Sequence, residues 1–184
     1  MKLDKHNKMR QEAPLSLWTP RNFNDQCSRH IHDYLCEEKE HLIYYIDSIN
    51  SFPINEIQEI TTDTTIFDRI QMITCLDMIE LRNIVLKIIA EGKETRGKII
   101  IHGIDTMMTN STIQMSSNKD HTYGILNQVL LQLRFYDVGS RIISNYSLRG
   151  VKRRRGNDKR WNSQDEMDNV IEYINKYYCD EEVI

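Results

Sequence analysis

Histidine and cysteine are the residue types in this chain best suited to metal binding or nucleophilic catalysis, yet their spacing favours neither. The six histidines form no HxxxH or HExxH motif and the four cysteines form no CxxC pair, the spacings that would bring zinc ligands together. His30 and His32 lie two apart in a predicted helix, so they point in different directions. No Ser-His-Asp or Cys-His set can be assembled, and Cys75 is expected to be a buried structural thiol. We therefore expect no catalytic residue, no metal and no cofactor.

Nucleotide hydrolysis is the next chemistry that the sequence argues against. A P-loop needs GxxxxGK[ST], whose backbone amides and lysine hold the phosphates, and this string occurs nowhere in the chain. The segment 18–24, ahead of the first predicted helix, has neither glycine nor lysine. Asp105, just beyond a predicted strand, is either a displaced metal carboxylate or a solvated loop or helix-cap residue. Without a phosphate site to keep a metal there, the second interpretation is favoured.

A basic segment at about 149–161 is the strongest functional signal. Seven basic residues and one acidic residue, Asp158, lie between Arg149 and Arg160. The basic residues are Arg149, Lys152, Arg153, Arg154, Arg155, Lys159 and Arg160. Adjacent cations repel one another and contribute nothing to folding, so they predict contact with a DNA phosphate backbone, with affinity from counterion release. Trp161 follows the segment and is suited to stacking on an unpaired base.

Two alternatives to DNA binding stay open for this segment: a nuclear import signal and an inert solvated surface. An import signal is compatible with DNA binding. If it were the only role, the chain would be a structural adaptor. Phe52, beside Pro53 after a predicted strand, also has two interpretations. It is either a core anchor or a contact for a partner, because partners and ligands gather at the carboxyl ends of parallel strands.

The elements that must position these residues alternate between strand and helix. Apolar runs rich in β-formers predict strands, and apolar residues at i, i+3, i+4 spacing predict helices. Strands are expected at 41–46, 66–73, 98–102 and 140–146. Helices are expected at 24–38, 77–89, 123–136 and 164–178, a short helix or turn at 55–60, and loops at 61–65 and 110–120. Residues 15–18 are expected to form an apolar cluster that docks on the domain. The pattern predicts an α/β domain, with a mostly parallel sheet covered by helices on both faces.

Composition agrees with one folded domain. The chain has 184 residues, 40% of them hydrophobic and 28% charged, which supports a packed core. We expect a disordered polar tail over residues 1–14 and one domain over 15–184. No apolar run reaches the roughly 20 residues that a membrane span needs, so no membrane association is expected. The absence of a signal-peptide core and of paired cysteines is typical of a cytosolic or nuclear protein.

Several stretches resemble RecA-like strand-exchange proteins. Residues 46–52 are similar to the strand and loop after their first crossover helix, 99–108 to their Walker B strand and its exit, and 140–145 to the strand before their DNA-binding loop. Residues 46–54 and 74–81, with Lys152–Arg155 and 173–178, sharpen the resemblance. Together they resemble the small chromosome-segregation-in-meiosis subunits of the budding-yeast Shu complex, from about Leu17 to the C-terminus.

This resemblance implies a truncated RecA-like core that lacks Walker A and has no ATPase activity. It implies an obligate heterodimer with a second recombinase-paralogue subunit, the platinum-sensitivity member, together with the other Shu subunits. It implies binding of single-stranded or forked DNA in the nucleus, where the complex would promote recombinase filament assembly in homologous recombination and error-free damage tolerance. Lys152–Arg155 match the family's DNA-contacting run, and Phe52 matches a loop aromatic that touches recombinase mediators. The polar N-terminal extension and residues 159–161 depart from the family, and their roles are not implied by it.

Overall fold

The computed structural model describes residues 15–18, 23–91, 97–114, 119–135, 140–143, 163–178 and 181–183. The tail predicted at residues 1–14 and the basic segment at 149–161 lie outside these ranges. The strands are β1 (Leu15–Trp18), β2 (Leu42–Asp47), β3 (Ile70–Thr74), β4 (Gly97–His102), β5 (Ser140–Ile143) and β6 (Glu181–Val183). They form one sheet in the order β3-β2-β4-β5-β1-β6, and every pairing in it is parallel.

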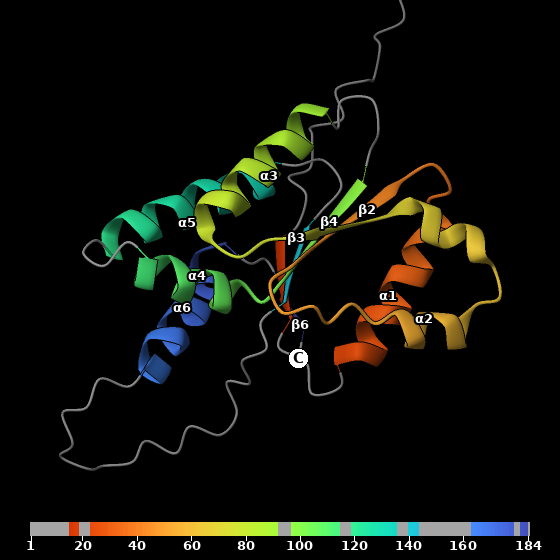
Figure 1. Cartoon of the computed structure of the whole chain (residues 1–184), viewed down its shortest axis with the longest axis horizontal. Helices are drawn as coiled ribbons and strands as arrows, with labels where there is room; N and C mark the ends of the chain where they lie inside the picture. The colour runs from red at the N-terminus through yellow and green to blue at the C-terminus, as the bar shows by residue number, and fades with distance from the viewer. Residues whose placement is uncertain are drawn as a thin grey trace, which may run out of the picture.

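Helices cover both faces of this sheet, which confirms the predicted α/β class. They are α1 (Phe23–Glu37), α2 (Ile54–Ile60), α3 (Met78–Glu91), α4 (Ile104–Gln114), α5 (Lys119–Arg134), α6 (Ser163–Tyr178) and the 3-10 helix η1 (Thr64–Arg69). Figure 1 shows α3, α4, α5 and α6 on one side and α1 and α2 on the other. Within the described residues, no helix is both long enough and apolar enough to span a membrane.

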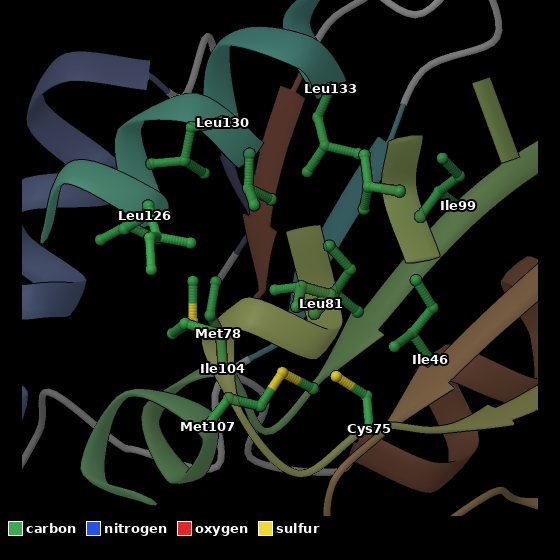
Figure 2. Close-up of a cluster of buried hydrophobic side chains, with 14 of the residues drawn as sticks. Ile46, Cys75, Met78, Leu81, Ile99, Ile104, Met107, Leu126, Leu130 and Leu133 are labelled. Atoms are coloured by element: carbon green, nitrogen blue, oxygen red, sulfur yellow. The ribbon is translucent and has the colours of Figure 1, made fainter. Parts of the chain in front are cut away.

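The larger half of the core lies between the sheet and helices α3, α4, α5 and α6. Ile46 and Ile99 point into it from β2 and β4, and meet a helix layer that includes Leu81, Leu126 and Leu130, as Figure 2 shows. All five of these side chains are fully buried. Burying one such side chain stabilises the fold by roughly 1.5–3 kcal/mol. The spacing that predicted an inward stripe on α5 is thereby confirmed.

Alternate residues of the same strands form the second half of the core. Ile43 and Tyr45 of β2 and Ile100 of β4 are fully buried against α1, α2 and η1. Successive strand residues point to opposite faces, and both faces are covered here. This explains why β2 and β4 read as continuous apolar runs. The predicted buried face of α1 is confirmed as well, since Ile31 and Leu35 are fully buried in this half.

Three expectations about elements were wrong. Residues 66–73 do not form one strand: η1 continues to Arg69, and β3 begins only at Ile70. Asp63 caps η1 by accepting a hydrogen bond from the Thr65 amide, so the apolar residues after it reach the core from a 3-10 turn. The loop expected at 110–120 is helical at both of its ends, because α4 continues to Gln114 and α5 begins at Lys119. Residues 15–18 form a strand between β5 and β6 rather than a docked cluster.

Candidate functional site

The carboxyl ends of the parallel strands meet in one row, which we call the carboxyl edge. Asp47 of β2 is in register with Thr74 of β3 and His102 of β4, and His102 with Ile143 of β5. Open parallel sheets bind ligands at this edge. The loop after β2, the start of α4 and the chain after β5 all leave the sheet here. The basic segment predicted to bind DNA follows β5, six residues beyond Ile143.

Asp47 closes the loop that follows β2. Its Oδ1 accepts a hydrogen bond from the Ile49 amide at 2.9 Å, and its Oδ2 accepts one from the Ser51 amide at 2.6 Å. Between them Asn50 adopts a left-handed backbone with φ 56°, which asparagine tolerates better than most residues. The buried carboxylate therefore fixes the shape of the loop instead of facing a ligand.

His102 ends β4 at the carboxyl edge, and it is fully buried. Its Nδ1 is 2.5 Å from the Ser51 hydroxyl and 3.0 Å from the Tyr45 hydroxyl. The Asp47 carboxylate lies 3.9 Å from the same nitrogen. The two hydroxyls lie within hydrogen-bond distance of this nitrogen, whereas the Asp47 carboxylate does not. The buried imidazole thus has the polar partners that a buried polar group needs to avoid a desolvation penalty. The edge between β2 and β4 is thus a closed internal network.

Burial disfavours the ionised forms of two groups here, the Cys27 thiol and the Tyr45 hydroxyl. Loss of solvation raises the pKa of the Cys27 thiol to about 12, although a hydrogen bond with Tyr45 opposes the shift. Burial also raises the pKa of Tyr45, and the charges of Cys27 and Asp47 act in the same direction. Neither side chain supplies a nucleophile near neutrality, since a thiol attacks as its thiolate.

Phe52 lies half-buried at the end of the same loop. Its ring packs edge-on against Tyr45 with 5.0 Å between ring centroids, a favourable aromatic geometry, and it adjoins the smaller half of the core. The contact with Tyr45 supports the interpretation of Phe52 as a core anchor. The side chain is nevertheless only partly buried. Ile54, two residues on, is 47% exposed. Contact of Phe52 with a partner remains a prediction.

Asp105 is not the solvated residue that the sequence predicted. It lies in the first turn of α4 and is only 6% exposed. Its Oδ1 is buried without a hydrogen-bond partner. Burial raises the pKa of this carboxyl, while backbone hydrogen bonds from its own amide and that of Thr106 oppose the shift. The expectation failed because α4 packs its first turn beside His102 at the end of β4.

The described cysteines are free thiols in two environments. Cys75 is buried, as predicted; burial raises its pKa to about 12, and its Sγ donates to the Asp77 carbonyl at 3.4 Å. Cys36 is exposed on α1, with its Sγ 3.5 Å from His32 Nε2. In the part of the chain that the structure describes, no three His, Cys, Asp or Glu side chains are grouped to hold a metal ion.

Sequence reasoning missed the residues that join the loop to the sheet. Ser48 donates from its hydroxyl to the Gly103 carbonyl at 2.8 Å, and Ser51 reaches His102. Serines directly after a strand that ends in aspartate were the available signal, but their partner lies about fifty residues away in the sequence. The predicted DNA-binding residues Arg149, Lys152–Arg155, Lys159 and Arg160 lie outside the described residues, so their interpretation remains a prediction.

Comparison with known proteins relates this arrangement to one protein family. Residues 15–96 match the family described as Shu complex component Csm2, DNA-binding. The chain is 29% identical to chromosome segregation in meiosis protein 2 of Candida glabrata, over 91% of this chain and 94% of that protein. It is 28% identical to the Saccharomyces cerevisiae protein of the same name, over 77% of this chain and 84% of that protein.

These alignments reach beyond the residues that match the family. A span covering 91% of 184 residues is about 167 residues long, so it necessarily includes residues 18–167. The loop at Phe52, the end of β4 and the basic segment at 149–161 all fall inside it. The alignment to the Candida glabrata protein therefore spans the whole predicted site.

Proposed function

We propose that this chain is a non-catalytic, DNA-binding subunit of a Shu-type recombinase-paralogue complex. The proposal is carried by one combined observation, the similarity to known proteins together with the position of the basic segment. Residues 15–96 match the Csm2 family, and the alignment to the Candida glabrata chromosome segregation in meiosis protein 2 covers 91% of the chain. A segment with seven basic residues lies between β5 and α6 inside that alignment. That segment follows a strand that ends at the carboxyl edge, where parallel sheets present their ligand-binding loops.

We further propose that the fold is a RecA-like core that has lost its nucleotide site. The parallel sheet with helices on both faces and the absence of the P-loop string from the sequence support this. The position of a Walker B carboxylate is occupied by His102, whose Nδ1 faces the Ser51 and Tyr45 hydroxyls. Neither feature supplies the phosphate nest or the metal ligand that hydrolysis requires.

In the proposed mechanism the basic segment adds positive charge to a DNA-binding face shared with the second recombinase-paralogue subunit, the platinum-sensitivity member. Lys152, Arg153, Arg154 and Arg155 contact phosphates and release counterions, which gives affinity with little sequence preference. The dimer, with the other Shu subunits, then offers a filament-like end on DNA where the recombinase nucleates. The chain breaks no covalent bond in this mechanism. Its contribution is to favour assembly of the recombinase on DNA. This work takes place in the nucleus, during homologous recombination and error-free damage tolerance.

Phe52 has a separate role in this proposal, as a contact for recombinase mediators. Its half-buried ring beside the exposed Ile54 offers an apolar surface on a loop held by hydrogen bonds. Aromatic residues on well-packed supports are the usual energetic centres of protein interfaces. The DNA contact and the mediator contact therefore use different segments and can be separated by mutation.

The experiment that tests the proposal compares two purified heterodimers in gel shifts with forked and single-stranded DNA. One carries the wild-type chain, and the other carries alanine at positions 152 to 155. DNA binding that falls markedly in the variant, with the heterodimer intact by gel filtration, supports the proposal. Equal binding by both would contradict it and favour an adaptor whose basic run serves only nuclear import. Binding of ATP to the chain alone, measured by calorimetry, would contradict the loss of the nucleotide site.

A further inference from the structure

We infer that His102 and Ser51 are positioning residues that hold Phe52 in its binding orientation. The inference rests on the proposed role of Phe52 and adds how the sheet fixes the orientation of this side chain. Ser51 directly precedes Phe52 in the chain, and its hydroxyl lies 2.5 Å from His102 Nδ1. His102 ends β4, 51 residues further along the sequence. One hydrogen bond thus ties the backbone beside Phe52 to a strand at the centre of the sheet.

The same nitrogen also supports the surface on which the Phe52 ring rests. Tyr45 packs edge-on against Phe52, and the Tyr45 hydroxyl lies 3.0 Å from His102 Nδ1. Because β2 and β4 are neighbours in register, this arrangement spans the centre of the sheet. His102 therefore holds Phe52 in two ways, through the chain at Ser51 and through the ring of Tyr45.

Three further contacts leave the loop little freedom to reorient. The Ser48 amide donates to the His102 carbonyl at 3.2 Å, and the Ser48 hydroxyl donates to the Gly103 carbonyl at 2.8 Å. At the other end, the Ser51 amide donates to the Asp47 carboxylate. A loop ordered before binding loses less conformational entropy when its partner arrives, which increases affinity. The network is thus suited to presenting one aromatic side chain in a fixed direction.

Histidine suits position 102 because its Nδ1 lies within hydrogen-bond distance of both the Tyr45 and the Ser51 hydroxyls. Asparagine can place an amide group close to that point, whereas leucine has similar bulk and no polar atom. His102→Leu would remove this partner from the Tyr45 and Ser51 hydroxyls, and the loss of a hydrogen-bond partner inside a protein is costly. His102→Asn is therefore the conservative variant, which should retain a polar partner for the Tyr45 and Ser51 hydroxyls. Ser51→Ala removes the link to the backbone with minimal change in volume.

The first test measures amide hydrogen exchange by mass spectrometry over residues 48–54 of the full chain, and needs no partner. We expect exchange in this segment to become about threefold to tenfold faster in Ser51→Ala and His102→Leu, the effect of losing one hydrogen bond. It should remain near wild type in His102→Asn. The matched control is Ser28→Ala, because the Ser28 hydroxyl donates to a backbone carbonyl within α1. Unchanged exchange in Ser51→Ala would overturn the inference, even if His102→Leu failed to fold.

The second test measures affinity for the purified recombinase mediator of the same organism, with Phe52→Ala as the reference. If Phe52→Ala weakens binding, we expect a loss of about threefold to tenfold in Ser51→Ala and His102→Leu, and recovery in His102→Asn. Weakened binding in Phe52→Ala alone would overturn the positioning role and leave the proposed contact intact. If Phe52→Ala binds normally, the proposed mediator contact fails, and hydrogen exchange alone decides whether the network orders the loop.

Discussion

The Ser48 hydroxyl and the Gly103 carbonyl are joined by a hydrogen bond of 2.8 Å that crosses from the end of β2 to the start of α4. Gly103 has φ +79°, and a Cβ at this position would collide with the Ser48 Oγ. The Gly103 carbonyl also accepts the Thr106 and Met107 amides at the start of α4. A single glycine thus permits close approach of the loop and the turn into the helix.

Gly103→Ala is expected to lower the free energy of unfolding by about 2 kcal/mol or more, because a left-handed backbone alone costs an L-residue roughly 1–2 kcal/mol. Chemical denaturation measures it. Adding Ser48→Ala should restore the stability lost through the collision between the new Cβ and the Ser48 Oγ. The stability lost through the left-handed backbone should remain lost. The matched control is Gly124→Ala within α5, where a Cβ meets nothing within 4 Å. That change should stabilise the helix by roughly 0.5–1 kcal/mol. Equal effects at both glycines would contradict this account.

Arg69 is predicted to be a structural cation. It donates through Nη2 to the Leu35 carbonyl at 2.8 Å and through Nη1 to the carbonyls of Glu38 and Lys39 at 3.0 Å each, so it caps the C-terminus of α1. Arg69→Ala should lower the free energy of unfolding by about 1.5–3 kcal/mol in thermal or chemical unfolding, the range for hydrogen bonds to a charged group.

The control for Arg69 is Arg29→Ala, since the Arg29 ion pair with Asp25 is exposed on both sides. Such pairs contribute about 0–1 kcal/mol. If Arg29→Ala destabilised the chain as much as Arg69→Ala, the capping role would be disproved.

Asp105 should make stability depend on pH. Burial raises its pKa in the folded chain above the ordinary value, so the folded state holds this proton more tightly than the unfolded state does. The resulting contribution to stability is fully present below the ordinary carboxyl pKa of roughly 4 and is lost as pH rises through the raised value.

Asp105→Asn removes this titration. We therefore expect the variant to gain stability relative to wild type between pH 4 and pH 7, measured as the difference in free energy of unfolding at each pH. Curves that stay parallel over this interval would show that Asp105 titrates normally in the folded chain.

The cysteines should differ in reactivity under native conditions. Cys36 is exposed, whereas Cys27 and Cys75 are buried with pKa values raised to about 12. Iodoacetamide at neutral pH should modify Cys36 and leave Cys27 and Cys75 intact, as read by peptide mass spectrometry. In denaturant all three should react. Native modification of Cys27 at the rate of Cys36 would be inconsistent with the packing of α1 on the sheet.

The sequence was sufficient to predict elements whose apolar pattern matches their surroundings. Strands β2 and β4 read as unbroken apolar runs because both of their faces are buried, and α5 shows a clear inward stripe. Polar helices were harder to recognise. In α4, Thr109 and Thr112 donate from their hydroxyls to carbonyls four residues back, so these polar side chains are satisfied within a helix that their composition does not predict.

Contacts between segments that are distant in the sequence could not be predicted from the sequence alone. Pairing of β1 with β5 and β6 depends on residues more than a hundred positions apart, and local propensity does not encode it. The same holds for the site, because nothing near Ser51 indicates that His102 is its partner. Phe52 and the basic segment were predicted from residue type, position in the sequence and resemblance to a family, so their roles rest on experiment.

The most direct test of the central claim is the salt dependence of DNA affinity for the purified heterodimer. For single-stranded DNA the slope of log K against log salt is about −0.7 for each phosphate contacted. Replacing Lys152, Arg153, Arg154 and Arg155 by alanine should therefore flatten the slope by up to about 3. The control removes the same charge elsewhere, by alanine at the exposed Arg29, Lys39, Lys87 and Lys176. We predict a flattened slope in the first variant and a nearly unchanged slope in the control. A wild-type slope in the first variant would contradict the account.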